Sequence, residues 1–528
     1  MNQINPIDIG ILVLYFGAML AMGAYFGRRA KSTESYFVGG RAYPGWLLGV
    51  SLFGATISSI TFVAYPADAY KTAWVRYLIC IMLPLGVLIA SRWFVPFFRR
   101  GKITSVFEYL EGRFGPGTRL YGASVFMLAQ CIRISMIQFL VALLMHRLTG
   151  WSVPACILLG GAITAYYTVV GGIEAVIWTD FVQSVILICG GLLILATIVY
   201  KLPGGMSQLF SVGWADGKFG LSQLNASGQL EPIAWGFALK EKTVIMLLIV
   251  GIFQWLAEYS TNQENIQKFC AAKSAKDARG AMWICCFLSV PTWGYFMLVG
   301  TGLYVFYQVF PDAQAHAMLT GASRAEEILP YFIATQLPVG LCGIVIAAVL
   351  AAAMSSMSSA MNSISAVAIT DVYKRHLVRN SDDRHYVNAA KLLTLASSII
   401  MVCGAYWLFL AGSSTLQDLA TELQSIVAGG LLGLYMLGFF TKRGDGRAVF
   451  VGILFAIVWS AIISLSGMGW LPTSWTEAIN RSFESYYTGI VSNVMMFVVG
   501  YLLSFFIPAR QHDLTNLTVW TQDKEPLT

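Results

Sequence analysis

Long apolar runs recur along the whole chain and are separated by short polar segments. A helix needs about 20 mostly apolar residues to cross the hydrocarbon core of a bilayer. Reading the chain with that window predicts an all-α polytopic membrane protein with about thirteen transmembrane helices. The predicted spans are 7–27, 45–66, 73–98, 119–147, 152–170, 174–200, 242–262, 277–308, 338–373, 388–409, 415–440, 446–467 and 487–508.

Two of these spans are unusually polar for membrane helices. The second holds Gly54 and the hydroxyls of Thr56, Ser58 and Thr61, and the seventh ends in a polar run from Glu258. Interrupted helices in two halves of a chain are typical of inverted-repeat transporters, because the broken ends expose backbone groups that bind ions and solutes. Small polar residues also line ordinary helix contacts. We predict a break in the second span; the seventh has no central Gly or Pro, and its pattern leaves the choice open.

Basic residues gather in alternate connections, which fixes a predicted orientation. Cytoplasmic segments of membrane proteins are rich in Lys and Arg, and this rule places the N-terminus outside and the C-terminus in the cytoplasm of a plasma (inner) membrane. The cytoplasmic clusters are Arg28 to Arg41, Arg99 to Arg119, Lys268 to Arg279, Lys374 to Lys391 and Lys442 to Arg447. In the long external segment 309–337, a short helix over the transport path is predicted from Ala325 to Gln336.

The composition supports lipid as the solvent for much of the surface. Hydrophobic residues make up 57% of the chain and charged residues 12%, against about 25% charged in soluble proteins. The net charge of +7 is spread over the loops rather than pooled in one patch, which argues against nucleic-acid binding.

A serine run marks the ninth span. Ser355, Ser356, Ser358 and Ser359 follow one another within five residues, with Ala352 one turn earlier. Ala352, Ser355, Ser356 and Ser359 share a helix face. Hydroxyls on one face beside a broken helix provide the hard oxygen donors that sodium prefers, and we favour an ion site over a plain small-residue helix contact.

Two of the charged residues within predicted spans are functional candidates. Asp180 is in the sixth span, where a carboxylate needs a cation or a proton; we favour an ion-linked role over an acid that reaches the cytoplasmic surface. Arg133 is in the middle of the fourth span and needs an anion. That anion is a solute carboxylate, or Glu258 or Glu422 in a structural ion pair; the sequence leaves these open.

The motifs of common enzymes are missing from the sequence, and we predict that the protein is not an enzyme. There is no GxSxG, no HExxH, no phosphate-binding loop and no CxxC. The five histidines are scattered near predicted loops.

Four stretches resemble the sodium:solute symporter family: 58–62, 171–180, 262–279 and the serine run 355–359. The resemblance implies a LeuT-type fold with two inverted repeats of five helices each. It divides the chain into an N-terminal helix and loop (1–44), the first repeat (45–200), an external loop (201–241), the second repeat (242–440), two further helices (441–510) and a cytoplasmic tail (511–528).

The family pattern also implies ligands for one or two sodium ions and no organic cofactor. Its main sodium site joins carbonyls at the break of the first repeat helix to a serine pair. A second site is implied by the similarity to the sialic acid branch. In this sequence the main site falls on Gly54, Ile57, Ala352, Ser355 and Ser356, and the second on Asp180, Ser358 and Ser359.

The same branch implies residues that contact the solute. Arg133 matches an arginine that binds a sugar-acid carboxylate, but Cys80 and Arg76 replace a glutamine and an aromatic residue of the sialic acid pattern, and Glu258 and Glu422 replace neutral amides. The predicted solute contacts are Thr56, Ser58, Thr61, Arg133, Glu258, Tyr259 and Glu422.

These departures leave the solute open among a sugar, a sugar acid such as sialic acid and another carboxylate. The predicted function is sodium-coupled import of a small polar solute across the bilayer by alternating access. A solute-binding membrane sensor and a proton-coupled transporter of the same fold are the alternatives.

Overall fold

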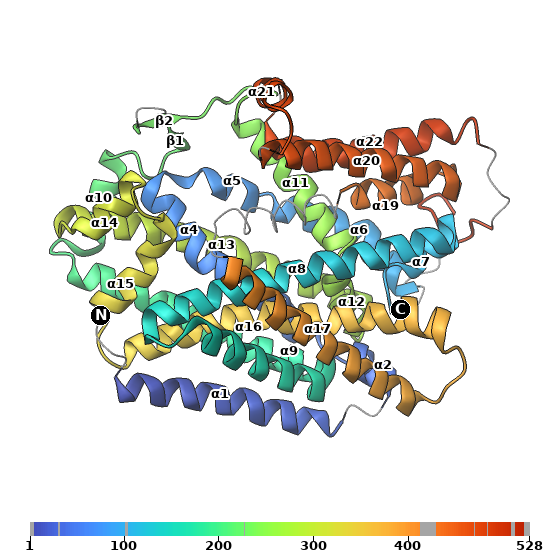
Figure 1. Cartoon of the computed structure of the whole chain (residues 1–528), viewed down its shortest axis with the longest axis horizontal. Helices are drawn as coiled ribbons and strands as arrows, with labels where there is room; N and C mark the ends of the chain where they lie inside the picture. Colours follow the sequence, from blue (N-terminus) through green and yellow to red (C-terminus); the bar gives the residue numbers. More distant parts are fainter. Residues whose placement is uncertain are drawn as a thin grey trace.

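Helices laid side by side make up almost the whole chain in the computed structural model (Figure 1). The structure describes residues 5–29, 32–100, 104–225, 228–411, 429–468, 470–482, 484–507 and 513–521. Glu422 and the first part of the predicted span 415–440 lie outside these residues.

The first part of the chain is a series of helices that follows the predicted spans closely. The elements are α1 (Pro6–Gly27), α2 (Thr33–Val38), η1 (Gly39–Arg41), α3 (Gly45–Thr56), α4 (Ser59–Lys71), η2 (Trp74–Arg76), α5 (Tyr77–Cys80), α6 (Leu83–Arg100), α7 (Glu108–Phe114), α8 (Pro116–Thr149) and α9 (Val153–Lys201).

The predicted external loop 201–241 contains structure of its own. It holds α10 (Gly205–Ala215) and a small antiparallel hairpin of β1 (Ser222–Leu224) and β2 (Leu230–Pro232). Next come α11 (Val244–Ser260), α12 (Gln263–Ala271), α13 (Ala275–Val309), α14 (Ala313–Thr320), η3 (Ala325–Glu327) and α15 (Ile328–Gln336). The predicted short helix at 325–336 is therefore present as η3 and α15.

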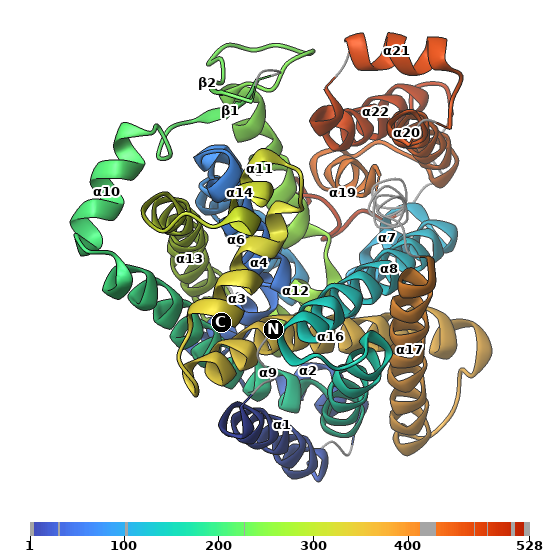
Figure 2. The ribbon, with the colours of Figure 1, turned by 60° about the vertical axis from the view of Figure 1, so that its left-hand side comes forward.

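The last part of the chain is again helical. It comprises α16 (Leu341–Val367), which continues as a π-helical segment η4 (Ala368–Leu377), then α17 (Asp383–Ala411), α19 (Leu431–Phe440), α20 (Gly446–Gly467), α21 (Thr473–Ser482), η5 (Ser485–Tyr487) and α22 (Thr488–Leu503). Helices α19, α20 and α22 pack together at one side of the molecule, apart from α1 (Figure 2).

One long element, α9, covers the two predicted spans 152–170 and 174–200. Its helical geometry is interrupted at Gly172, where φ is +58°. A side chain is disfavoured at this φ, and a Cβ at this position would also meet the carbonyl oxygen of Tyr36 at 2.8 Å. The glycine therefore lets two helical arms join without a separate loop.

Helix α16 forms the centre of the bundle. From Val345 to Val367 every residue is buried, and the helix packs against α9, α8, α1 and α17. Its many Ala and Ser side chains are short, so neighbouring backbones approach closely. The serine run therefore faces protein on all sides.

Within the described part of the chain, eight helices are long and apolar enough to cross a membrane. Two further pairs pass the same test together but are bent: α3 with α4 by 58°, and α11 with α12 by 51°. The protein is an integral multi-pass membrane protein with two broken spans. The second break answers the question that the sequence left open for the seventh predicted span.

Candidate ion and solute sites

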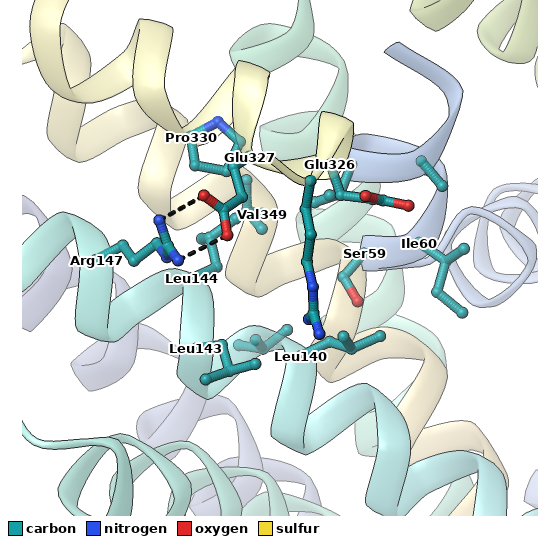
Figure 3. Close-up of a pocket in the computed structure, with 14 residues that line it drawn as sticks. Ser59, Ile60, Leu140, Leu143, Leu144, Arg147, Glu326, Glu327, Pro330 and Val349 are labelled. Atoms are coloured by element: carbon teal, nitrogen blue, oxygen red, sulfur yellow. Dashed lines mark hydrogen bonds and ion pairs between the residues drawn. The ribbon is translucent and has the colours of Figure 1, made fainter. Parts of the chain in front are cut away.

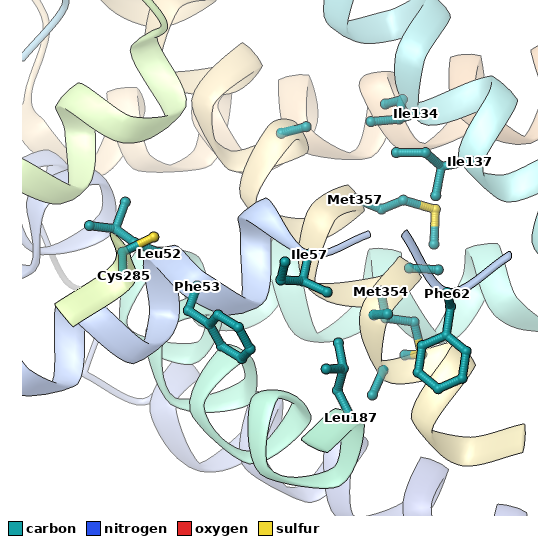
Figure 4. Packing of buried hydrophobic residues seen from close by; sticks show 14 of the residues in the cluster. Leu52, Phe53, Ile57, Phe62, Ile134, Ile137, Leu187, Cys285, Met354 and Met357 are labelled. Atoms are coloured by element: carbon teal, nitrogen blue, oxygen red, sulfur yellow. The ribbon is translucent and has the colours of Figure 1, made fainter. Parts of the chain in front are cut away.

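The first helix break brings backbone carbonyls into the middle of the bundle. Helix α3 ends at Thr56, Ile57 is extended with φ −88° and ψ 99°, and α4 begins at Ser59. The last carbonyls of a helix have no partner within it. Ile57 is fully buried and lies among Phe53, Met354 and Met357 (Figure 4).

Two serines of α16 meet these carbonyls. The hydroxyl of Ser355 donates to the carbonyl of Gly54 at 2.7 Å, and the hydroxyl of Ser356 donates to that of Ala55 at 3.0 Å. Both hydroxyls also lie 3.2 Å from the carbonyl of Ala352. These hydrogen bonds join four of the five predicted main-site residues, namely Gly54, Ala352, Ser355 and Ser356.

The donor set at this break suits a sodium ion. It consists of neutral oxygen atoms from hydroxyls and carbonyls, and the end of α3 adds the partial negative charge of a helix C-terminus. The carbonyl of Ala55 belongs to the set but was not predicted, because a backbone ligand leaves no signal in its own side chain. Ile57, the fifth predicted residue, forms no hydrogen bond with the serines.

Gly54 has a steric role as well. A Cβ at this position would meet the hydroxyl of Ser184 at 2.5 Å and the carbonyl oxygen of Asp180 at 3.0 Å. Glycine therefore allows the end of α3 to lie directly against α9, where Asp180 is found.

Asp180 lies in a buried polar cluster that includes a lysine. Its Oδ2 atom accepts from Lys268 Nζ at 2.9 Å, from Ser51 Oγ at 2.8 Å and from Ser359 Oγ at 3.1 Å. Lys268 also donates to the carbonyl of Ser51 at 3.0 Å. Asp180 Oδ1 has no partner among the described residues.

The predicted second sodium set is thus brought together only in part. Ser359 contacts Asp180, but the hydroxyl of Ser358 donates to the carbonyl of Ser355 in its own helix. The side chain of Lys268, assigned above to a cytoplasmic cluster, is only 1% exposed. The assignment to a cytoplasmic loop is therefore wrong for Lys268. This residue lies on the helix α12, and its ammonium group pairs with the buried carboxylate of Asp180.

A cavity of about 380 Å³ opens beside the two helix breaks. Three of the predicted solute contacts, Thr56, Arg133 and Glu258, line it. Its other lining residues come from α8, α11, the α11–α12 break, α19 and α22 and include Phe126, Gln130, Gln254, Trp255, Thr261, Asn262, Leu431 and Asn493.

Arg133 pairs with Glu264, an acid that the sequence pattern did not single out. Its Nη1 lies 3.2 Å from Glu264 Oε2, and it also donates to Gln130 Oε1 at 3.4 Å. Glu264 is 4% exposed and lies on α12, just beyond the second break. The partner is therefore neither Glu258 nor, among the described residues, a more distant acid. In the sequence, only the possible break in the seventh span pointed to Glu264, because a break there turns the start of α12 toward α8.

Glu258 lies at the end of α11 and is held by two amides. Its Oε1 accepts from Asn262 Nδ2 at 2.8 Å and from Asn265 Nδ2 at 2.9 Å. Asn262 is the N-cap of α12 and also accepts from the backbone N–H of Glu264 at 2.9 Å. Asparagine is a strong N-cap. Asn262 can therefore start α12 directly after the end of α11, and the break needs no Gly or Pro.

Three other predicted solute contacts lie away from this cavity. Ser58 and Thr61 are buried at the start of α4, at 9% and 4% exposure. The hydroxyl of Tyr259 is 3.2 Å from the thiol of Cys285, and its ring stacks on Phe269. Tyr259 of α11 therefore packs against α12 and α13.

A second cavity, of about 370 Å³, lies between α4, α8 and the segment η3–α15 (Figure 3). Ser59 lines one wall. Across the opening, Arg147 of α8 pairs with Glu327 through two contacts of 2.7 and 2.6 Å. This bidentate pair ties the short helix to α8 and closes one side of the cavity.

Two broken spans around a buried oxygen site, with a charged cavity beside them, define a secondary transporter of the LeuT type. The family model "Sodium:solute symporter family" matches residues 36–456. The chain therefore belongs to the sodium:solute symporter family, and its LeuT-type fold agrees with the fold class predicted from the sequence. The count of thirteen spans and the five-plus-five repeat stay predictions.

Individual relatives match over nearly their full length. The chain is 32% identical to the sodium/sialic acid symporter SiaT of Proteus mirabilis, over 98% of both chains. It is also 32% identical to the sodium/sialic acid symporter NanT of Aliivibrio fischeri, over 93% of this chain and 91% of that one. A solved outward-open structure of a Na⁺-coupled sialic acid symporter superimposes with a TM-score of 0.85 at 30% identity. The match covers 96% of this chain and 99% of that one.

Proposed function

We propose that this protein imports a small polar organic solute by coupling it to the inward movement of sodium. The solute is a sugar, a sugar acid such as sialic acid, or another carboxylate. The observation that carries the proposal is the meeting of Ser355 and Ser356 with the carbonyls at the end of α3, next to a charged cavity.

Each part of this arrangement has a role in transport. Sodium binds the carbonyls of Gly54, Ala55 and Ala352 and the two serine hydroxyls, and so links α16 to the first broken span. The solute binds in the cavity that Thr56, Arg133 and Glu258 line. Because Thr56 follows the sodium-binding carbonyls directly, an ion that orders the end of α3 also orders the wall of the solute cavity.

Alternating access then moves both ligands. Sodium enters from the outside, where it is abundant, and favours the outward-open state. Rocking of one set of helices against the other opens the inside. Loss of sodium weakens solute binding by the same factor by which sodium strengthened it. The N-terminus is outside and the C-terminus cytoplasmic, in a plasma (inner) membrane.

The second sodium site is less fully assembled than the main one, since Ser359 contacts Asp180 but Ser358 does not. Asp180, Ser358 and Ser359 would provide its oxygen atoms, with Asp180 Oδ1 turned toward no described partner. Lys268 must then move or share Asp180 with the ion, since it contacts Oδ2. One sodium at the main site is therefore the minimum for each transport cycle.

The test is solute binding and uptake with and without sodium. The purified protein is screened for thermal stabilisation by sugars, sugar acids and carboxylates in sodium or potassium chloride, since a ligand that binds the folded state raises the melting temperature. Solutes that stabilise only in sodium are then tested for uptake into proteoliposomes.

The expected result is concentrative uptake that collapses when the sodium gradient is removed. Sodium-dependent binding without any uptake would instead show the sensor, and uptake that follows a proton gradient in potassium would show proton coupling. Either result would refute sodium symport.

A further inference from the structure

The charges of the solute cavity do not balance within the described residues. Arg133 and Glu258 are the charged residues among its described lining. Arg133 is already paired with Glu264, which lies behind it. Glu258 forms no direct ion pair with a described residue, and the one guanidinium near it, that of Arg133, acts on both Glu258 and Glu264. Two carboxylates therefore share one described cation, which leaves one negative charge unbalanced.

Among the described residues, no Lys, Arg or His contacts Glu258 directly. Residues 412–428, which precede α19 and lie outside the described part, contain no Lys, Arg or His. The partners of Glu258 are the neutral amides of Asn262 and Asn265, and both contact Oε1. Its Oε2 accepts no hydrogen bond from any described residue. Glu258 is half-buried and lines the cavity, so this oxygen is open to a ligand. An acid within a membrane-spanning helix needs a cation or a proton.

The remaining walls suit a small cation. The aromatic residues Phe126 and Trp255 line the same cavity, as does Thr56. A carboxylate together with aromatic faces is the usual recognition chemistry for an ammonium group. A solute with only a carboxylate would add a second unbalanced negative charge here.

We propose that the transported solute carries a protonated amine, and that Glu258 binds this amine. The inference rests on the proposed function, because it concerns the same cavity. A carboxylate of the same solute can contact the remaining N–H groups of Arg133, since its Nε and Nη2 donate to no described residue. The cavity then suits a zwitterionic solute such as an amino acid or an amino sugar acid, or a basic amino sugar.

The experiment compares matched pairs of solutes that differ in the charge of one nitrogen or lack the amine. The pairs are glucosamine with N-acetylglucosamine, mannosamine with N-acetylmannosamine, and β-alanine with propionate, at pH 6.5 in sodium chloride. Binding to the purified full-length protein is measured by thermal stabilisation and by titration calorimetry. We expect the amine member of at least one pair to bind about ten- to a hundredfold more tightly, as for a hydrogen bond to a charged group.

Variants assign the preference to Glu258. Glu258→Gln keeps the shape but removes the charge, and it should abolish the preference for the amine while sodium alone still stabilises the protein. Glu258→Asp should restore part of the preference. Glu231→Gln, which alters an exposed acid on β2, should behave like the wild type.

Three results would overturn the inference. The first is that no amine binds more tightly than its counterpart. The second is that Glu258→Gln keeps the preference. The third is uptake of one proton by the protein for each solute bound, measured calorimetrically in buffers of different ionisation enthalpy, because Glu258 would then carry a proton. A wild-type protein that prefers amines but shows no response to sodium would refute the proposed function and leave this inference standing.

Discussion

At the scale of single residues, hydroxyls that donate to carbonyls mark the place for an ion. Ser355 and Ser356 donate to carbonyls that α3 leaves unpaired at its end. We propose that the same oxygen atoms turn their lone pairs to the ion when sodium binds. The serines thus satisfy the carbonyls in the absence of the ion and become ligands in its presence.

This gives a direct prediction for sodium binding. Ser355→Ala and Ser356→Ala each remove one oxygen ligand, and we expect the sodium concentration for half-maximal stabilisation to rise about tenfold or more. The measurement is the melting temperature against sodium concentration. Ser365→Ala, on the same helix but bonded to the carbonyl of Ala390, is the control. An unchanged sodium titration in both site variants would contradict the site.

The pair of Asp180 and Lys268 makes a second residue-scale prediction. Both side chains are almost fully buried, and removing one partner of a buried pair leaves an uncompensated charge, at a cost of about 3–5 kcal/mol. Lys268→Met and Asp180→Asn should therefore each lower the melting temperature. The double variant should recover much of the loss, because neither charge remains. A double variant as unstable as the sum of the two single variants would show that the pair is not coupled.

At the scale of elements, the two helix breaks have different chemical origins. The α3–α4 break follows Gly54 and places an extended residue between the two halves. The α11–α12 break has no glycine or proline and depends on Asn262 as an N-cap. Each break exposes polar groups toward α16 or α8, so the sites form where two interrupted spans meet continuous helices.

The short segment η3–α15 acts at this scale as a cover for the second cavity. Glu327→Gln breaks its ion pair with Arg147. Because this pair is partly exposed, it is worth about 0.5–1 kcal/mol. We expect the cavity wall to become two- to fivefold more accessible, measured as the rate at which a cysteine introduced by Ser59→Cys reacts with a membrane-impermeant thiol reagent.

The matching control exchanges the two charges. Arg147→Glu combined with Glu327→Arg should return the labelling rate toward that of the unaltered pair, because the attraction is restored. An equal labelling rate in all three proteins would show that the segment does not cover Ser59.

At the scale of the whole molecule, the main ion site and the solute cavity share the end of α3. Gly54 and Ala55 belong to the proposed ion site, and Thr56 lines the cavity. We expect sodium to tighten solute binding, and the solute to tighten sodium binding by the same factor. Titration calorimetry of each ligand, with and without the other, measures the factor. A factor of one would mean that the two sites are independent.

The hydrophobic pattern was enough to determine much of the architecture. Most described helices lie within a few residues of a predicted span, because a bilayer demands long apolar helices and the sequence records that demand directly. The serine run and the mid-span Asp180 and Arg133 were also visible in the sequence, since polar residues are costly in such helices.

The partners of those residues were decided only by the tertiary structure. Glu264 for Arg133 and Lys268 for Asp180 both lie on α12, which the sequence pattern assigned to a polar loop after the seventh span. A bend of 51° turns this short helix back into the bundle. Apolar periodicity reports which residues avoid water, but the pairing of buried charges depends on which helices meet. The sequence alone therefore determined that the chain spans a membrane and holds polar sites there, while helix packing decided what each buried charge contacts.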